Sequence, residues 1–562
     1  MRTVPRLTGA AARDTTALAL GTCLSLAWYA PHLGFYSDDW AFLGRYATSA
    51  DQTVGGLFEA SYSSQHAMRP LQVWLCAILY RTFGMDPTGY HVFNGVLLVL
   101  NPLLCYAIAR ELRIPRSIAF STALMYGLLP NYSTDRFWYV AIAITLSMTA
   151  CLASIYADLK AAGAPLRTGV AWKAAGCAAL VISSLSYEVA LPLFLVVPAL
   201  IVWRAWRARR SLPRARIIYL ALLVAINVVL LAGVAAFKLR TTVRLGAERG
   251  VAAQVSEISR HALRRDLPDG AYGLNVLSAM RVHVGDYGVR LPATALTLAR
   301  TAPAAVLWLT TLFAVAAFAY TAAAIRTEPW PPVQTWGALI AAGILVFGLG
   351  YAIFLTNYNV QFTPAGIANR SAIAAALGAA MCIVGCTGGL VTPLRRLRRV
   401  AFAVLVALFA SSGFLIVNVI AERWIAAYDT EERVLARIRQ RFPTLPPHST
   451  LLLDGICPYA GPAIVFESNW DLAGALQVFY HDATLAADVV TPRLTVGDDA
   501  VTTTIYQQRT KYPFGPGLFV YHAGTDVVQP LTDAAKARAY FATSTMGRSC
   551  PAGKEGVGVD LF

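Results

Sequence analysis

Residues 15–40 read TTALALGTCLSLAWYAPHLGFYSDDW, an apolar run that ends just before a pair of carboxylates. Its first part, residues 15–34, is long enough to cross a membrane as a helix. Adjacent acids at the mouth of such a span are costly at a membrane surface unless they serve a function there. Asp38 and Asp39 are therefore the first candidates for a functional site.

The composition is that of an integral membrane protein. Of the 562 residues, 57% are hydrophobic and 14% are charged, and the mean hydropathy is +0.53. Soluble proteins average about 25% charged residues. The net charge of +16 is explained by arginines at short loops, so we expect no nucleic-acid partner. No small-residue cleavage site follows the basic start, Met1–Asp14, so the first span is predicted to be uncleaved.

Apolar runs predict a polytopic bundle of about eleven transmembrane helices. The segment from 171 to 205 is too long for one span and is divided at Ser186-Tyr187-Glu188. The shorter run Arg69–Phe83 is predicted to be an amphipathic helix on the membrane surface. The predicted spans lie at 15–34, 90–110, 117–131, 138–158, 171–187, 189–205, 215–237, 301–325, 335–356, 371–392 and 400–421.

The arginine-rich loops set the predicted orientation. Loops 110–116, 204–216 and 393–399 carry most of these arginines and are placed in the cytoplasm with the amino terminus. Loop 238–300 then lies outside although it is basic too. Two interpretations of this loop stay open: a cationic surface over an anionic lipid-linked substrate, or a solvated helix beside anionic headgroups.

The chain after Ala421 predicts a small extracytoplasmic α/β domain. It contains Cys457 and Cys550, for which a disulfide is allowed in that compartment, and no zinc-like cysteine spacing. The fold class is thus mainly α: a transmembrane region, 1–421, followed by an extracytoplasmic domain, 422–562. The predicted elements of this domain are an amphipathic helix at Ile420–Arg441, strands at Thr450–Leu453, Ala463–Phe466 and Leu518–His522, and a helix at Asp471–Tyr480.

Several polar motifs fall at the predicted exterior ends of the spans. A carboxylate within reach of a hydroxyl can act as a general base, and the planar fork of arginine suits phosphate. Structural interpretations compete with these, such as a helix cap at the acid pair or an arginine that snorkels to headgroups. The motifs are Ser37-Asp38-Asp39-Trp40, Arg69-Pro70-Leu71, Tyr90-His91-Val92-Phe93-Asn94, Asp135-Arg136, Ser186-Tyr187-Glu188 and Asn369-Arg370.

In their order and sidedness, these motifs make residues 1–205 resemble the GT-C superfamily of polytopic glycosyltransferases. The nearest likeness is to the protein-mannosyltransferase and aminoarabinose-transferase-like branches. The resemblance implies a polyprenyl-phosphate sugar as donor and an acid of the first exterior loop as catalytic base. That acid maps to Asp38, with Asp39 second, and the donor phosphate is assigned to Arg69 and Arg370. The second half of the chain matches in span layout only.

The sequence therefore predicts a glycosyltransferase of the bacterial inner membrane that acts on the extracytoplasmic face and inverts the sugar. The expected partners are the polyprenyl-phosphate-linked sugar, a glycan, lipid or protein acceptor, and membrane lipids. No cofactor is required, although Mg²⁺ or Mn²⁺ is compatible with the acid pair. The catalytic candidates are Asp38 and Asp39, and the substrate-binding candidates are Arg69, His91, Asn94, Asp135, Arg136, Glu188 and Arg370.

Two other functions stay open. A polymerase or ligase acting on polyprenyl-diphosphate glycans would use the basic loop with Arg264 and Arg265 in place of the acid pair. A transporter or flippase for lipid-linked sugars would have ionisable residues at mid-membrane depth and broken helices repeated in two halves. Separate substitution of Asp38 and of the two arginines distinguishes the first alternative from the transferase.

Overall fold

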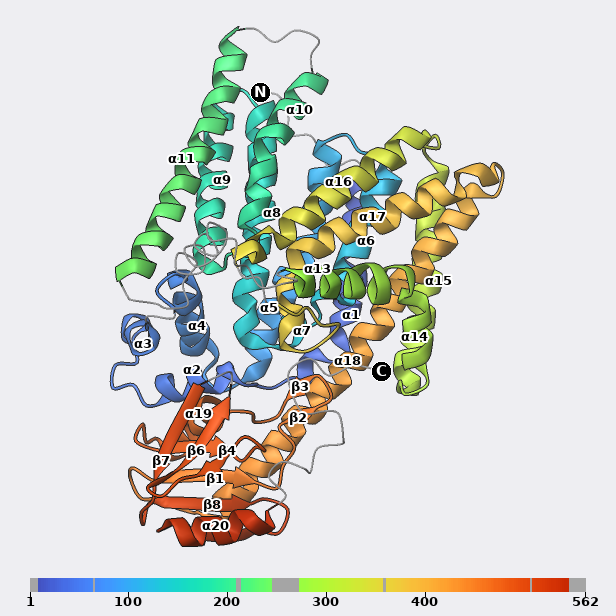
Figure 1. Cartoon of the computed structure of the whole chain (residues 1–562). Helices are drawn as coiled ribbons and strands as arrows, with labels where there is room; N and C mark the ends of the chain where they lie inside the picture. Colours follow the sequence, from blue (N-terminus) through green and yellow to red (C-terminus); the bar gives the residue numbers. More distant parts are fainter. Residues whose placement is uncertain are drawn as a thin grey trace.

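The computed structural model describes residues 9–63, 66–208, 214–244, 272–356, 360–505 and 508–544. Long helices make up most of it, and a small sheet domain lies at one end (Figure 1). The long helices are α1 (Gly9–Ala27), α5 (Pro87–Glu111), α6 (Arg116–Leu128), α8 (Ile142–Gly163), α9 (Leu166–Ser186), α10 (Val197–Ala208), α11 (Arg214–Arg244), α15 (Ala304–Arg326), α16 (Val333–Ala352), α17 (Ile373–Val391) and α18 (Arg398–Arg441).

Short helices connect the long ones. They are α2 (Asp38–Ala47), α3 (Val54–Ser61), α4 (Pro70–Phe83), α7 (Thr134–Phe137), α13 (Gly273–Met280) and α14 (Leu291–Ala299). The 3-10 helices are η1 (Ala30–His32), η2 (Pro130–Tyr132), η3 (Tyr139–Ala141), η4 (Leu191–Val196), η6 (Ile353–Thr356), η7 (Ile367–Ala372) and η8 (Thr392–Leu394), and η5 (Arg281–Val289) is a π-helix.

Within the described residues, eight helices are long and apolar enough to cross a membrane. This makes the chain a multi-pass membrane protein but does not confirm the predicted count of eleven spans. The three other predicted spans correspond to α1, which includes Arg13 and Asp14, to α6, which has 13 residues, and to the short apolar stretch Leu191–Arg204. The predicted division after the fifth span is confirmed, since α9 ends at Ser186.

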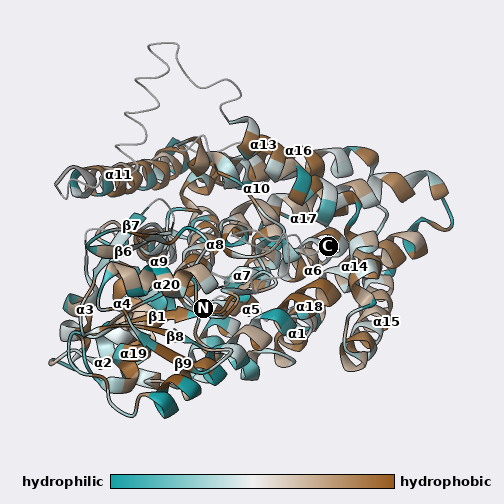
Figure 2. Ribbon diagram, turned by 60° about the horizontal axis from the view of Figure 1, so that its bottom comes forward, coloured by the Kyte–Doolittle hydropathy of each residue, from teal (hydrophilic) through white to brown (hydrophobic). Residues whose placement is uncertain are grey.

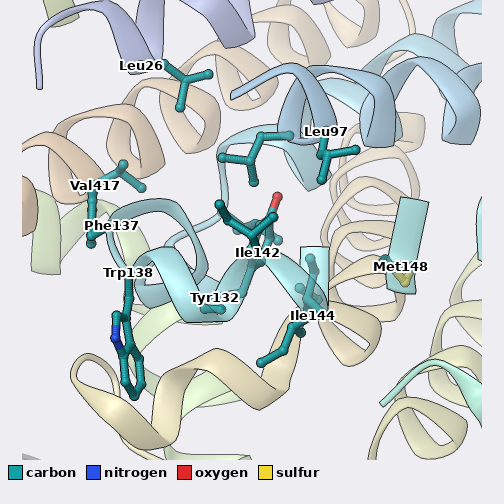
Figure 3. Packing of buried hydrophobic residues seen from close by; sticks show 14 of the residues in the cluster. Leu26, Leu97, Tyr132, Phe137, Trp138, Ile142, Ile144, Met148 and Val417 are labelled. Atoms are coloured by element: carbon teal, nitrogen blue, oxygen red, sulfur yellow. The ribbon is translucent and has the colours of Figure 1, made fainter. Parts of the chain in front are cut away.

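The outer helices are rich in apolar residues (Figure 2), and many of these residues are exposed, as on a lipid-facing surface. Val229 of α11, Trp308 of α15 and Ile344 of α16 are each at least 62% exposed. Inside the bundle, Leu26, Leu97, Phe137, Ile142 and Val417 pack together from five helices (Figure 3). Apolar residues therefore cover the outer surface of the helices and also fill the core between them. Buried polar residues make specific contacts between helices.

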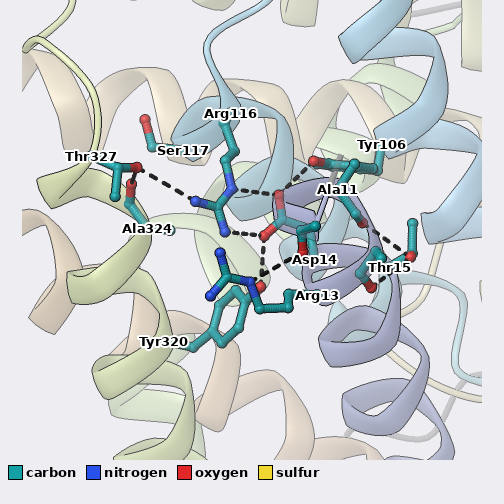
Figure 4. Close-up of polar contacts among 12 residues, drawn as sticks. Ala11, Arg13, Asp14, Thr15, Tyr106, Arg116, Ser117, Tyr320, Ala324 and Thr327 are labelled. Carbon is teal, nitrogen blue, oxygen red and sulfur yellow. Dashed lines mark hydrogen bonds and ion pairs between the residues drawn. The ribbon is translucent and has the colours of Figure 1, made fainter. Parts of the chain in front are cut away.

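One such contact ties four helices together where α1 begins (Figure 4). The buried carboxylate of Asp14 receives two hydrogen bonds from Arg116, both 2.6 Å long, one from Tyr106 and one from Tyr320. These four residues, here called the Asp14 cluster, come from α1, α5, α6 and α15.

The tail domain is built on a four-stranded sheet with the order β4-β1-β8-β9, in which β9 is antiparallel to its neighbour. Cys457 is disulfide-bonded, and Cys550 lies outside the described residues. The elements are β1 (Thr450–Asp454), β2 (Tyr459–Ala460), β3 (Ala463–Ile464), α19 (Asn469–Tyr480), β4 (Ala486–Val489), β5 (Thr495–Val496), β6 (Ala500–Ile505), β7 (Gln508–Pro513), β8 (Leu518–His522), β9 (Val527–Pro530) and α20 (Ala534–Thr543).

The predicted domain boundary at 421/422 falls inside α18, a continuous helix of 44 residues that runs from the bundle into the tail domain (Figure 1). The predicted last span and the amphipathic helix after it are thus one element. At the other side of the tail domain, α19 packs against α2, the helix that begins with the acid pair. The tail domain therefore reaches the segment between α1 and α5.

Candidate active site

A cavity of about 200 Å³ opens beside the first turn of α2. The segments that line it are distant in sequence: α2, the start of α4, η3 with α8, the turn after α9, and η7. Three predicted site residues, Asp38, Arg69 and Arg370, thus share one cavity. The full lining is Asp38, Phe42, His66, Arg69, Gln72, Trp138, Val140, Ala141, Ile144, Tyr187 and Arg370.

The two acids of the pair have different surroundings. The carboxylate of Asp39 is fully buried and accepts backbone N–H groups from Tyr36 at 2.8 Å and from Val140 at 2.9 Å. Asp39 therefore connects residues 36–39, here called the acid turn, to the segment after α7. Asp38 is the acid that faces the cavity.

The cavity changes the acidity of Asp38. Burial raises the pKa of this carboxyl group, while the positive charge of Arg370, the polar indole of Trp470 and the charge of Arg45 act in the opposite direction. The balance is a pKa above the usual aspartate value. A carboxylate with a raised pKa is a stronger proton acceptor, which suits a general base.

Arg69 is held at the cavity wall by a buried carboxylate. It directly precedes α4, which begins at a proline as helices often do. Its Nε donates to Glu188 at 2.8 Å, its guanidinium lies 3.8 Å from the centre of the Tyr187 ring, and Lys238 bonds the other oxygen of Glu188 at 2.7 Å. Although burial opposes ionisation, Arg69 and Lys238 keep the pKa of Glu188 below its usual value. Burial also lowers the pKa of His66 to about 4, helped by Arg45 and Arg69.

Arg370 faces the cavity without a carboxylate partner. Its guanidinium lies 4.7 Å from the centre of the Trp138 ring, and it makes no ion pair or hydrogen bond with any residue that the structure describes. The preceding Asn369 anchors it: the buried amide donates to the carbonyls of Asn131 and Pro364, both at 2.9 Å. Arg370 is therefore positioned but left available for an anionic ligand.

The remaining predicted residues lie behind the cavity and do not line it. His91 contacts the carbonyl of Gly34 at 2.9 Å, and Asn94 donates to the backbone carbonyl of Asp135 at 2.7 Å. Burial raises the pKa of Asp135, whose carboxylate is fully enclosed. Arg136 is 2% exposed and bonds inside the bundle. These four residues support the walls of the site.

Sequence reasoning missed several residues of the site. Trp138 had the pattern of an interfacial aromatic, and Lys238 follows an apolar run as a snorkelling lysine does. Asn369 belongs to a predicted motif, but its amide hydrogen bonds join segments more than 200 residues apart in sequence. Trp470, which affects the pKa of Asp38, comes from the tail domain, and no local pattern connects it with α2.

Among the described residues, no group of three or more His, Cys, Asp or Glu side chains is arranged to hold a metal ion. Both oxygens of Asp39 are also occupied by backbone amides. What lines the cavity instead is one carboxylate, Asp38, and two guanidinium groups, Arg69 and Arg370, each of which lies over an aromatic ring. These groups can accept a proton and bind an anion.

No protein-family model matches the chain, and no curated protein sequence is similar to it. Among solved structures it is similar to ArnT from Cupriavidus metallidurans bound to undecaprenyl phosphate, at 15% identity and a TM-score of 0.37, over 85% of this chain and 90% of ArnT. It is also similar to ArnT from the same organism in the apo state, at 14% identity and a TM-score of 0.38, over 79% of this chain and 82% of ArnT.

An oligosaccharyltransferase from Archaeoglobus fulgidus, tethered to an acceptor peptide, is similar at 14% identity and a TM-score of 0.38, over 79% of this chain and 62% of that one. All three solved structures have TM-scores below 0.5, so this likeness carries no argument about family or activity.

Proposed function

We propose that this protein is a membrane glycosyltransferase that moves a sugar from a polyprenyl-phosphate donor to an acceptor on the extracytoplasmic face. The observation that carries the proposal is the convergence of Asp38, Arg69 and Arg370 on one cavity. A proton acceptor and phosphate-binding groups in one cavity are what transfer from a phosphate-activated sugar needs.

In the proposed reaction, Asp38 accepts the proton of the acceptor hydroxyl. The hydroxyl oxygen forms a bond to the anomeric carbon as the bond from that carbon to the phosphate oxygen breaks. Attack from the face opposite the phosphate inverts the configuration and releases polyprenyl phosphate. Arg69 and Arg370 stabilise the negative charge that develops on the leaving phosphate.

The cavity contains cationic groups suited to the phosphate of the donor. Arg69 and Arg370 line it, and Arg45 is a further positive charge that acts on Asp38. Arg264 and Arg265, on which the alternative ligase interpretation depends, lie outside the described residues.

The test is turnover of a labelled polyprenyl-phosphate sugar by the purified full-length protein in detergent. We expect Asp38→Asn to lower kcat by about 10²–10⁴-fold, the usual contribution of a general base. The donor should still bind, because both arginines remain. The matched control is Asp429→Asn, an exposed aspartate on α18, which should turn over like the wild type. Near-normal turnover by Asp38→Asn, or consumption of nucleotide sugars alone, would overturn the proposal.

A further inference from the structure

The turn before Asp38 has an unusual backbone conformation. Ser37 has φ 46° and ψ −116°, and the N–H of Asp39 donates to the carbonyl of Tyr36 at 2.9 Å. These are the features of a tight turn that normally has glycine at this position, because other residues rarely adopt positive φ. Strained residues of this kind persist where surrounding contacts hold them, and they are concentrated at functional sites.

The contact that holds Ser37 comes from the tail domain. Ser37 is 1% exposed, and its hydroxyl donates to Oε1 of Glu467 at 3.3 Å. The two residues are 430 positions apart in the sequence. Glu467 is itself 2% exposed. A position that usually has glycine is thus occupied by a serine whose hydroxyl is hydrogen-bonded to a fixed carboxylate.

The carboxylate of Glu467 is oriented from within the tail domain. Its Oε2 accepts the hydroxyl of Tyr459 at 2.6 Å, and its backbone N–H donates to Asp471 at 2.8 Å. Asp471 lies in the first turn of α19, the helix that packs on α2. Glu467 therefore links the frame of the tail domain directly to the acid turn.

We propose that Glu467 is a positioning residue through which the tail domain holds Ser37 at positive φ and so directs Asp38 into the cavity. Glu467 does not line the cavity, and its effect on catalysis passes through the backbone of Ser37. The tail domain thereby has a role in the reaction that does not require it to touch the sugar. This inference rests on the proposed function for its activity readout.

The test uses the full-length protein and the labelled polyprenyl-phosphate sugar. Glu467→Ala is expected to lower kcat by about 10²-fold with little change in the KM for the donor, as for a displaced catalytic group. Glu467→Gln, which keeps an acceptor oxygen for Ser37, should lose less. The control is Glu432→Ala, an exposed glutamate on α18, which should behave as the wild type.

Rescue at Ser37 separates positioning from a general loss of folding. Glycine adopts positive φ without help, so Ser37→Gly should restore turnover in the Glu467→Ala background. Ser37→Ala, which has neither the hydroxyl nor this freedom, should reduce kcat by itself. A double variant no better than Glu467→Ala, or equal turnover of Ser37→Ala and Ser37→Gly, would overturn the inference.

Hydrogen exchange provides a readout that does not depend on the donor. Without any substrate, Glu467→Ala should speed exchange in residues 35–41, and Ser37→Gly should slow it again in the double variant. If the wild type does not consume the donor, the proposed function fails while this exchange pattern still tests the inference. Unchanged exchange in Glu467→Ala would refute the link between the tail domain and the acid turn.

Discussion

At the scale of single residues, the acidity of Asp38 predicts the pH dependence of the reaction. A general base works only when deprotonated, so the rate should fall as the pH falls through the pKa of Asp38. Because burial raises this pKa, the acid limb should lie above the value of about 3.9 for an exposed aspartate.

Arg370 opposes that rise, since its positive charge favours the carboxylate. Arg370→Gln should therefore move the acid limb of kcat/KM to higher pH, measured on the residual turnover. Arg45→Gln is the matched comparison. The charge of Arg45 has the smallest of the effects on this pKa, so its removal should move the acid limb less. An acid limb that moves to lower pH in Arg370→Gln would contradict the assignment of Asp38 as the base.

At the scale of elements, the packing of α2 on α19 should be as important as the residues on it. The two helices meet at Gly44 and Gly474, where the backbones touch: a Cβ added to Gly474 would lie 2.2 Å from the carbonyl oxygen of Trp40. Because that neighbour is backbone, it cannot move away without shifting the turn of α2.

Gly474→Ala is therefore expected to destabilise the docking of the tail domain by about 1–3 kcal/mol, the usual cost of overpacking. Both the apparent Tm and kcat should fall. Gly515→Ala is the control in the same domain, because a Cβ there meets nothing within 4 Å. Equal loss in the two variants would show that the contact between α2 and α19 has no special role.

The sequence predicted individual elements better than their contacts. The break at Ser186 followed from span length, and the helix predicted at Asp471–Tyr480 is observed as Asn469–Tyr480. The contact between α2 and α19 joins segments that no periodicity relates. The candidate site follows the same division: Asp38, Arg69 and Arg370 were indicated by charge at span ends, whereas Asn369 and Glu467 act through contacts that only the fold creates.

At the scale of the whole molecule, the cavity and the Asp14 cluster are built from different residues. α2 lines the cavity and packs on α19 of the tail domain, whereas the Asp14 cluster joins α1, α5, α6 and α15 (Figure 4). Asp14 is fully buried, and Arg116, its cationic partner, is 13% exposed. Removing one charge of such a pair leaves the other uncompensated, at a cost of roughly 3–5 kcal/mol.

Asp14→Asn should therefore lower the apparent Tm of the purified protein strongly, while the protein that remains folded keeps the kcat and KM of the wild type. Arg13→Gln is the control, because Arg13 is a neighbouring charge whose Nε bonds only to the carbonyl of Gly9 on an exposed face. The opposite pattern is expected for Asp38→Asn, which removes turnover without removing a buried ion pair. If Asp14→Asn instead reduced kcat at unchanged Tm, the Asp14 cluster would be coupled to the cavity.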